Sequence, residues 1–216
     1  SYKTNYTPKL CKIVNELGGY AEVVSEMELE IAKRIGCKPD KIIWNGPIKN
    51  PKIVEAFLLE GGCVNVDSIE ELEMVKGIHQ RYPETLINVG IRCNYDVQDG
   101  VVSRFGFDID GDDFKAAVAF AVATNYVKLV NFQCHFAKRQ IDYWPARAKG
   151  MVEMIDRLGI IPERIDIGGG LFGKMAPSLK AQFSSEIPDY AAYAKAAAQV
   201  FADYFADKDV KPELLI

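Results

Sequence analysis

Short apolar stretches alternate along this chain with longer stretches that are apolar on one side only. The short stretches are rich in β-branched and aromatic residues and are bounded by turn residues, which is typical of buried strands. We expect eight strands, at Ser1–Thr4, Tyr20–Val24, Lys41–Trp44, Cys63–Val66, Leu86–Cys93, Val127–Cys134, Arg164–Ile167 and Glu213–Ile216. The longer stretches between them, of about ten to fifteen residues, have the period of an amphipathic helix.

Several predicted helices carry recognisable ends. Pro8 begins the first as a first-turn proline, and Gly18–Gly19 ends it. In SEMELEIAKRIG, Ser25 is placed to cap the helix and acidic residues follow, as the helix dipole favours. In DSIEELEMVKGI, Ser68 and Glu71 have the spacing of a capping box. The alanine-rich segments DDFKAAVAFAVATN and PDYAAYAKAAAQVFADYFAD also predict helices.

Eight strands that alternate with seven helices predict parallel strands joined by right-handed crossovers. We therefore expect an α/β fold, a TIM-type (β/α)8 barrel, that occupies residues 1–216 as a single domain. The alternative is an open, doubly wound sheet.

Composition narrows the classes of protein. The chain is 49% hydrophobic with a net charge of −4, so it offers no basic stripe for nucleic acid or an anionic membrane. No apolar run approaches the roughly 20 residues that span a bilayer. The five cysteines lie far apart, without a CxxC pair, and predict reduced, buried thiols in a cytoplasmic protein. We expect no metal site.

Three features follow predicted strands, where a barrel carries its chemistry. RIDIGGGLFG places three glycines after the seventh strand, a turn that suits anion binding or is simply tight. Lys3 ends the first strand and is either a solvated charge or the amine of a phosphate-bearing cofactor site. His135 follows the sixth strand and is a catalyst or an ordinary hydrogen-bonded residue.

These motifs resemble a known family. SYKTN, AEVVSEMELE, IIWNGPIKN, VNVDSIEEL, IRCN, SRFGFDI, FQCHF and IDIGGGLFG are similar, in order, to segments of the barrel domain of fold-type III pyridoxal-phosphate enzymes. The likeness is greatest to the ornithine and diaminopimelate decarboxylase branch of this alanine racemase-like superfamily. It implies pyridoxal 5'-phosphate as cofactor and an amino acid as substrate.

The resemblance also implies site residues. Lys3 would hold the cofactor as an imine, His135 would stack on its ring, and Arg92 would lie near the ring oxygen or the lysine. Arg92 could instead simply form an ion pair with a nearby carboxylate. The glycines Gly168, Gly169 and Gly170 would bind the phosphate.

Two positions depart from the family pattern. Glu22, which we include among the cofactor-binding residues, stands where the decarboxylases usually have aspartate. Lys138 replaces a serine that would help to hold the phosphate. These differences concern the substrate more than the cofactor.

The resemblance therefore favours an amino-acid decarboxylase, a carboxy-lyase. A racemase of the same fold, a non-catalytic carrier of the cofactor, and a barrel enzyme acting on another phosphorylated substrate are the alternatives. By resemblance we also expect that the chain is a barrel excised from a longer protein with an N-terminal segment and a C-terminal β-domain. That parent protein would be a homodimer, and the barrel alone would be inactive.

Overall fold

The computed structural model describes residues 1–183 and 187–216. By its internal contacts the chain forms two compact units. The first, unit 1, holds residues 1–94 and 104–133, and the second, unit 2, holds residues 95–103 and 134–216.

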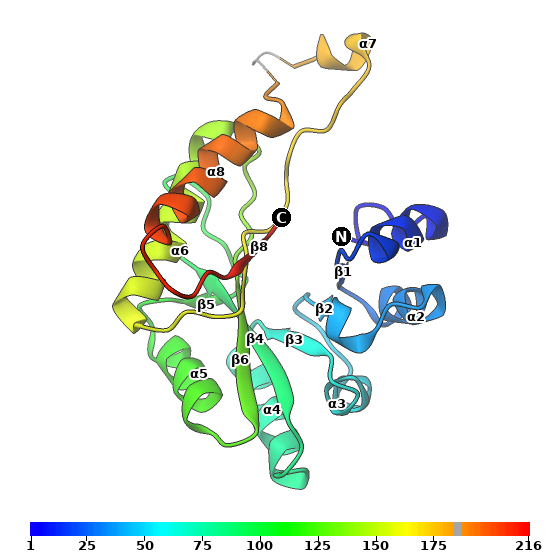
Figure 1. Ribbon diagram of the computed structural model, residues 1–216, viewed down its shortest axis with the longest axis vertical. Helices are drawn as coiled ribbons and strands as arrows, with labels where there is room; N and C mark the ends of the chain where they lie inside the picture. The colour runs from blue at the N-terminus through cyan, green and yellow to red at the C-terminus, as the bar shows by residue number, and fades with distance from the viewer. Residues whose placement is uncertain (184–186) are drawn as a thin grey trace. The chain divides into compact units, whose positions relative to one another are not determined.

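Unit 1 is built on parallel strands that lie side by side in chain order (Figure 1). Those strands are β1 (Ala21–Val23), β2 (Ile42–Trp44), β3 (Cys63–Val66), β4 (Ile87–Asn94) and β6 (Val127–Gln133). A two-residue strand that the sequence did not predict, β5 (Phe107–Asp108), pairs with the end of β4. Within unit 1 the order never reverses, as it would at the switch point of a doubly wound sheet.

Helices alternate with the strands of unit 1, and the first helix precedes β1. They are α1 (Pro8–Glu16), α2 (Glu26–Ile35), α3 (Pro51–Leu59), α4 (Ile69–Arg81) and α5 (Asp112–Ala123), with a 3₁₀ turn, η1, at Pro39–Lys41. Side-chain oxygens of Ser25, Asn50 and Ser68 accept main-chain N–H groups at the starts of α2, α3 and α4. Both predicted serine caps are therefore confirmed.

Unit 2 contains η2 (Ile141–Tyr143), α6 (Trp144–Leu158), β7 (Arg164–Asp166), α7 (Pro177–Lys180), α8 (Tyr190–Tyr204) and β8 (Glu213–Leu215). Strands β7 and β8 are parallel. The main-chain N–H of Cys134, which follows β6, donates to Asp166 O of β7 at 2.8 Å. Helices α6 and α8 pack together, with the rings of Trp144 and Tyr193 5.0 Å apart.

Each unit has its own apolar interior. Trp44, Phe57 and Phe132 are completely buried in unit 1, and Trp144 is completely buried in unit 2. All five cysteines are free and buried, as predicted.

The predicted first strand, Ser1–Thr4, is wrong. Tyr2 N donates to Glu22 O, so the segment starts beside β1. Thr4 N and Asn5 N then both donate back to Ser1 O, at 3.2 and 3.3 Å. The chain bends into a turn there because these bonds close it before a ladder can form.

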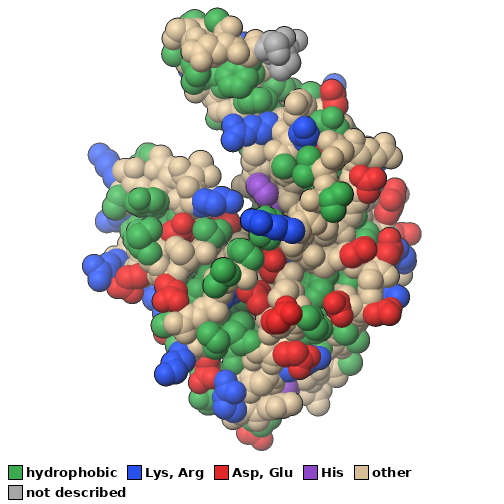
Figure 2. Space-filling view, turned by 180° about the vertical axis from the view of Figure 1, so that it is seen from behind, with side chains coloured by type: hydrophobic (Ala, Val, Ile, Leu, Met, Phe, Trp, Pro, Cys, Tyr) green, Lys and Arg blue, Asp and Glu red, His purple; other side chains and the backbone are tan. Residues whose placement is uncertain are grey.

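No helix in the described part of the chain is long and apolar enough to cross a membrane. Acidic and basic side chains are both spread over the face seen in Figure 2, without a continuous basic stripe.

Candidate active site

Lys3 lies in unit 1, in the turn that precedes α1. Its side chain is exposed, and no described residue gives it a hydrogen-bond or ion-pair partner. The preceding residue, Tyr2, is buried, with its hydroxyl 3.7 Å from the sulfur of Cys37. Burial raises the pKa of Tyr2, so its phenol stays neutral at this contact. Tyr2 thus anchors the turn, and Lys3 projects from it.

Glu22, on β1, begins a row of polar side chains that crosses unit 1. Its Oε1 accepts from Asn45 Nδ2 at 3.0 Å, and Asn45 Oδ1 accepts from Asn65 Nδ2 at 2.6 Å. Asn65 Oδ1 accepts from Asn131 Nδ2 at 3.0 Å. Strand β4 lies between β3 and β6, and its Gly90 leaves room for that last contact, because a Cβ there would lie 1.8 Å from Asn65 Oδ1.

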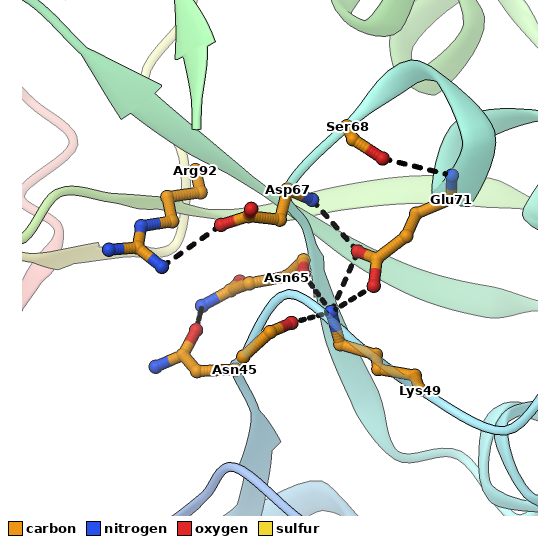
Figure 3. Close-up of polar contacts among 8 residues, drawn as sticks. Asn45, Lys49, Asn65, Asp67, Ser68, Glu71 and Arg92 are labelled. Atoms are coloured by element: carbon orange, nitrogen blue, oxygen red, sulfur yellow. Dashed lines mark hydrogen bonds and ion pairs between the residues drawn. The ribbon is translucent and has the colours of Figure 1, made fainter. Parts of the chain in front are cut away.

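A buried ion pair lies beside this row (Figure 3). The amine of Lys49 has no exposed surface and lies 2.7 Å from the carboxylate of Glu71. It also donates to the carbonyl oxygens of Gly46 and Asn65, at 2.5 and 3.1 Å. Burial lowers the pKa of Lys49 and raises that of Glu71, and their mutual attraction opposes both shifts.

From the sequence, Glu71 was predicted only as half of a capping box. Ser68 Oγ does accept from Glu71 N at 3.4 Å. The carboxylate of Glu71, however, accepts hydrogen bonds from Lys49 Nζ and from Asp67 N, the latter at 2.9 Å. The signal that could have found this pair is a lysine five residues after Trp44, the last residue of an apolar strand.

Arg92, on β4, forms an ion pair with Asp67, with its Nη1 2.9 Å from Asp67 Oδ1 (Figure 3). Its guanidinium lies over the ring of Phe105, 4.9 Å from the centroid. Gly106 packs against the Arg92 main chain, where a Cβ would approach Arg92 O to 2.9 Å. The ion pair of Arg92 with a carboxylate, one of the two alternatives expected from the sequence, is therefore present, and it holds the arginine in one orientation.

A hollow of about 390 Å³ in unit 1 opens beside Asp67 and Ser68. Asp108, Asp112 and Asp113 also line it, so its lining is acidic and unsuited to a phosphate. No group of three or more His, Cys, Asp or Glu residues in the described ranges could hold a metal ion.

In unit 2, His135 and the glycine turn lie together. Gly168 has a φ of +68°, and a Cβ on it would lie 2.6 Å from both Cys134 O and His135 Nδ1. Gly168 N donates to Asp166 Oδ1 at 2.8 Å, which fixes the start of the turn. Gly170 has a φ of +93°. Only glycine satisfies both the backbone angle and the approach of the histidine at position 168.

Arg147, on α6, was not singled out from the sequence. It is completely buried and donates to the carbonyl oxygens of Phe136, Lys138 and Gly169. Burial lowers the pKa of its guanidinium, which nonetheless remains charged. An arginine in an amphipathic helix gives no sequence signal that separates it from a surface residue.

The predicted site residues thus fall into two sets. Lys3, Glu22 and Arg92 belong to unit 1, and no hydrogen bond between their side chains is present among the described contacts. His135 and the three glycines belong to unit 2, where His135 and Gly168 are in contact.

Comparisons with known proteins point in one direction. The family model for the pyridoxal-binding domain of pyridoxal-dependent decarboxylases matches residues 1–216. A diaminopimelate decarboxylase of Aquifex aeolicus is 29% identical over 202 residues, which are 87% of this chain and 47% of that relative. One from Actinosynnema pretiosum is 31% identical over 157 residues, 69% of this chain and 36% of the relative.

Solved structures of decarboxylases are similar in fold to this chain. The crystal structure of a diaminopimelate decarboxylase from M. jannaschii has a TM-score of 0.80 at 26% identity, covering 98% of this chain and 50% of that one. An arginine decarboxylase of Paramecium bursaria Chlorella virus has a TM-score of 0.70 at 20% identity, covering 98% and 54%. This chain spans about half the length of the relatives that it matches.

Proposed function

Because the chain belongs to the pyridoxal-dependent decarboxylase family, as the match over residues 1–216 shows, we propose that the protein carrying it removes the α-carboxylate of a diamino acid. The family and the solved relatives confirm the predicted fold, a parallel β/α-barrel domain, and the predicted cofactor, pyridoxal phosphate. The reaction, the substrate and the roles of individual residues are our proposal.

The residues of unit 2 fit such a cofactor. A phosphate is bound by N–H groups that have no other acceptor, and the main-chain N–H groups of Gly169 and Gly170 have none among the described contacts. Gly168 and Gly170 adopt the positive φ angles of this turn, and Gly168 N is bonded to Asp166 Oδ1. The observation that supports the proposal is the contact of Gly168 with His135, because the imidazole that we propose to stack on the cofactor lies directly beside that turn. When bound, pyridoxal phosphate supplies a conjugated ring that accepts the electron pair left on Cα as carbon dioxide departs.

Lys3 is the lysine best suited to hold the cofactor covalently. Its amine is exposed and has no partner among the described residues, so it is available to react. Lys49 is unsuited to the same role, because four contacts with protein oxygens and complete burial occupy its amine.

We assign the other predicted site residues to orienting the cofactor and to shielding it from water. His135 offers a flat ring beside the phosphate turn, and Phe136, buried next to it, helps to keep water away. Asp67 holds the guanidinium of Arg92 in place, so that it can position a polar group of the cofactor. Glu22, in the middle of β1, accepts a hydrogen bond from Asn45 that holds its carboxylate.

The substrate proposal follows from the names of the relatives. The Aquifex and Actinosynnema proteins are both named diaminopimelate decarboxylases. A structure of the M. jannaschii enzyme is described as a complex with L-lysine and resembles this chain with a TM-score of 0.76 at 23% identity. We therefore propose meso-diaminopimelate as the first substrate to test.

Borohydride reduction of the cofactor-loaded, full-length protein tests the role of Lys3. Peptide mapping should place the reduced cofactor on Lys3, because its amine is the exposed one at the predicted site. Lys3→Ala should lose the label and most of the activity, about a thousandfold or more, since a covalent contact has no substitute. Lys12→Ala, at an exposed ion pair on α1, is the matched control. A label on Lys49 or Lys138 would contradict the assignment.

A panel of amino acids tests the reaction. The full-length protein with pyridoxal phosphate is incubated with meso-diaminopimelate, lysine, ornithine and arginine, and carbon dioxide is measured. Release from one of them supports the proposal. Exchange of the α-hydrogen without carbon dioxide would replace it with a racemase, and cofactor binding without any turnover would replace it with a carrier.

A further inference from the structure

Arg147 has an unusual environment for a buried cation. Its side chain is completely buried, and the guanidinium lies 4.4 Å from the ring centroid of Trp144. It donates to Gly169 O at 3.0 Å, to Phe136 O at 3.1 Å and to Lys138 O at 2.5 Å. One side chain therefore ties the segment after β6 to the glycine turn after β7.

These three bonds also orient three N–H groups. In a trans peptide the carbonyl and the following N–H point to opposite sides. When each carbonyl points at the guanidinium, the N–H groups of Ala137, Arg139 and Gly170 point away from it. None of the three donates to an acceptor in the described part of the chain. Arg147 thus presets a group of donors for a ligand that accepts several hydrogen bonds.

The charge of Arg147 is not neutralised by an ion pair within the described ranges. Asp99 acts on it electrostatically but lies beyond ion-pair distance. Lys49, in contrast, is neutralised by the carboxylate of Glu71. A desolvated cation without a counter-ion is unfavourable by itself, and an anion bound nearby reduces that cost.

We propose that Arg147 is a positioning residue for the phosphate of a phosphate monoester, which it binds indirectly through the N–H groups of Ala137, Arg139 and Gly170. Carbonyls bonded to a cation become more polarised, and their peptides become stronger N–H donors. This arrangement supplies donors where Lys138 stands in place of the serine of the family pattern. That the monoester is pyridoxal phosphate rests on the proposed function.

Binding measurements on the full-length protein test this role. Dissociation constants are measured for pyridoxal phosphate, for pyridoxal, which lacks the phosphate, and for inorganic phosphate. Arg147→Met should weaken binding of pyridoxal phosphate and inorganic phosphate by about tenfold or more. It removes the positive charge and leaves the three peptide groups without the hydrogen bonds that orient them. Binding of pyridoxal should change by less than about twofold. Arg157→Met, an exposed position of the same helix, is the matched control.

A second variant keeps the test decisive if Arg147→Met does not fold. Arg147→Lys retains the charge but lacks the planar fork that reaches three carbonyls, so it should show the same selective loss. Equal weakening of pyridoxal and pyridoxal phosphate, or no weakening of either, in the folded variant would overturn the proposal. If phosphate binding depends on Arg147 while no cofactor adduct forms, the proposed function fails and this inference stands.

Discussion

At the scale of single residues, two glycines allow polar groups to meet. Gly168 places the turn after β7 against His135, and Gly90 lets Asn65 and Asn131 bond across β4. At both positions a Cβ would occupy the space of the neighbouring polar contact. The absence of a side chain at Gly168 and Gly90 therefore allows these polar groups to come together.

Replacing Gly168 by alanine should disrupt the cofactor site. The new Cβ would lie 2.6 Å from His135 Nδ1 on a backbone with a φ of +68°, so the histidine or the turn must move. We expect at least about a tenfold loss of pyridoxal phosphate affinity, the equivalent of about 1.4 kcal/mol, measured by absorbance titration.

Gly169 provides the control for this substitution. It lies in the same turn, but a Cβ there has no atom within 4 Å and its φ is not in the left-handed region. Gly169→Ala should therefore retain most of the affinity. Equal effects of the two substitutions would mean that the contact with His135 does not matter.

At the scale of elements, the pair of Lys49 and Glu71 joins two segments of unit 1. Lys49 lies in the segment between β2 and α3, and Glu71 lies in the first turn of α4. Glu71 also accepts from Asp67 N, and the side chain of Asp67 holds Arg92. The buried pair is therefore linked, through Asp67, to the guanidinium of Arg92 on β4.

Removing the amine of Lys49 should lower the free energy of unfolding considerably. Lys49→Met leaves the Glu71 carboxylate buried without its partner, and loss of one member of a buried pair costs about 3–5 kcal/mol of unfolding free energy. The double variant Lys49→Met/Glu71→Leu should recover much of this loss. Lys33→Ala, at the half-exposed pair with Glu60, should cost no more than about 1 kcal/mol, as measured by urea denaturation.

The free energy of unfolding of Lys49→Met should also depend on pH in a characteristic way. Burial raises the pKa of Glu71 above its ordinary value of 4.5, and loss of Lys49 raises it further. The native state then holds a proton that the unfolded state releases, so stability falls as pH rises above about 4.5. Relative to the unaltered protein, Lys49→Met should be least destabilised in acid. A penalty that is independent of pH would exclude the carboxylate as its cause.

At the scale of the whole molecule, the reactivity of the cysteines can measure how often each unit opens. Cys11, Cys37, Cys63 and Cys93 are buried in unit 1, and Cys134 is buried in unit 2. A buried thiol reacts with a reagent only when its surroundings open. Labelling rates at these positions therefore measure the opening of two distinct parts of the chain.

Thiol labelling of the native protein should be slow at all five positions and complete only in denaturant. Mass spectrometry of peptides after timed labelling gives the rate at each cysteine. Pyridoxal phosphate should slow labelling of Cys134 in particular, because that residue precedes His135 and contacts the glycine turn. Rapid labelling of Cys134 in the presence of cofactor would contradict a binding site at this turn.

Much of this protein follows from the sequence by itself. Strand and helix positions come from hydrophobic period, and Cys63–Val66 was predicted to the residue. The glycine turn was recognisable because it follows the seventh predicted strand and resembles a family motif, whereas three glycines alone could form a simple tight turn. The first strand was not predictable by period, since four residues with one apolar position cannot distinguish a strand from the turn that main-chain bonds to Ser1 produce.

Tertiary structure alone decided which polar residues are buried and with what partners. Glu71 is 22 positions from Lys49, and Gly169 is 22 positions from Arg147, so no local pattern connects them. A lysine, a glutamate or an arginine in an amphipathic segment has the same appearance in sequence whether it faces solvent or the interior. Its depth, and therefore its charge state and function, is set by the strands and helices that pack around it.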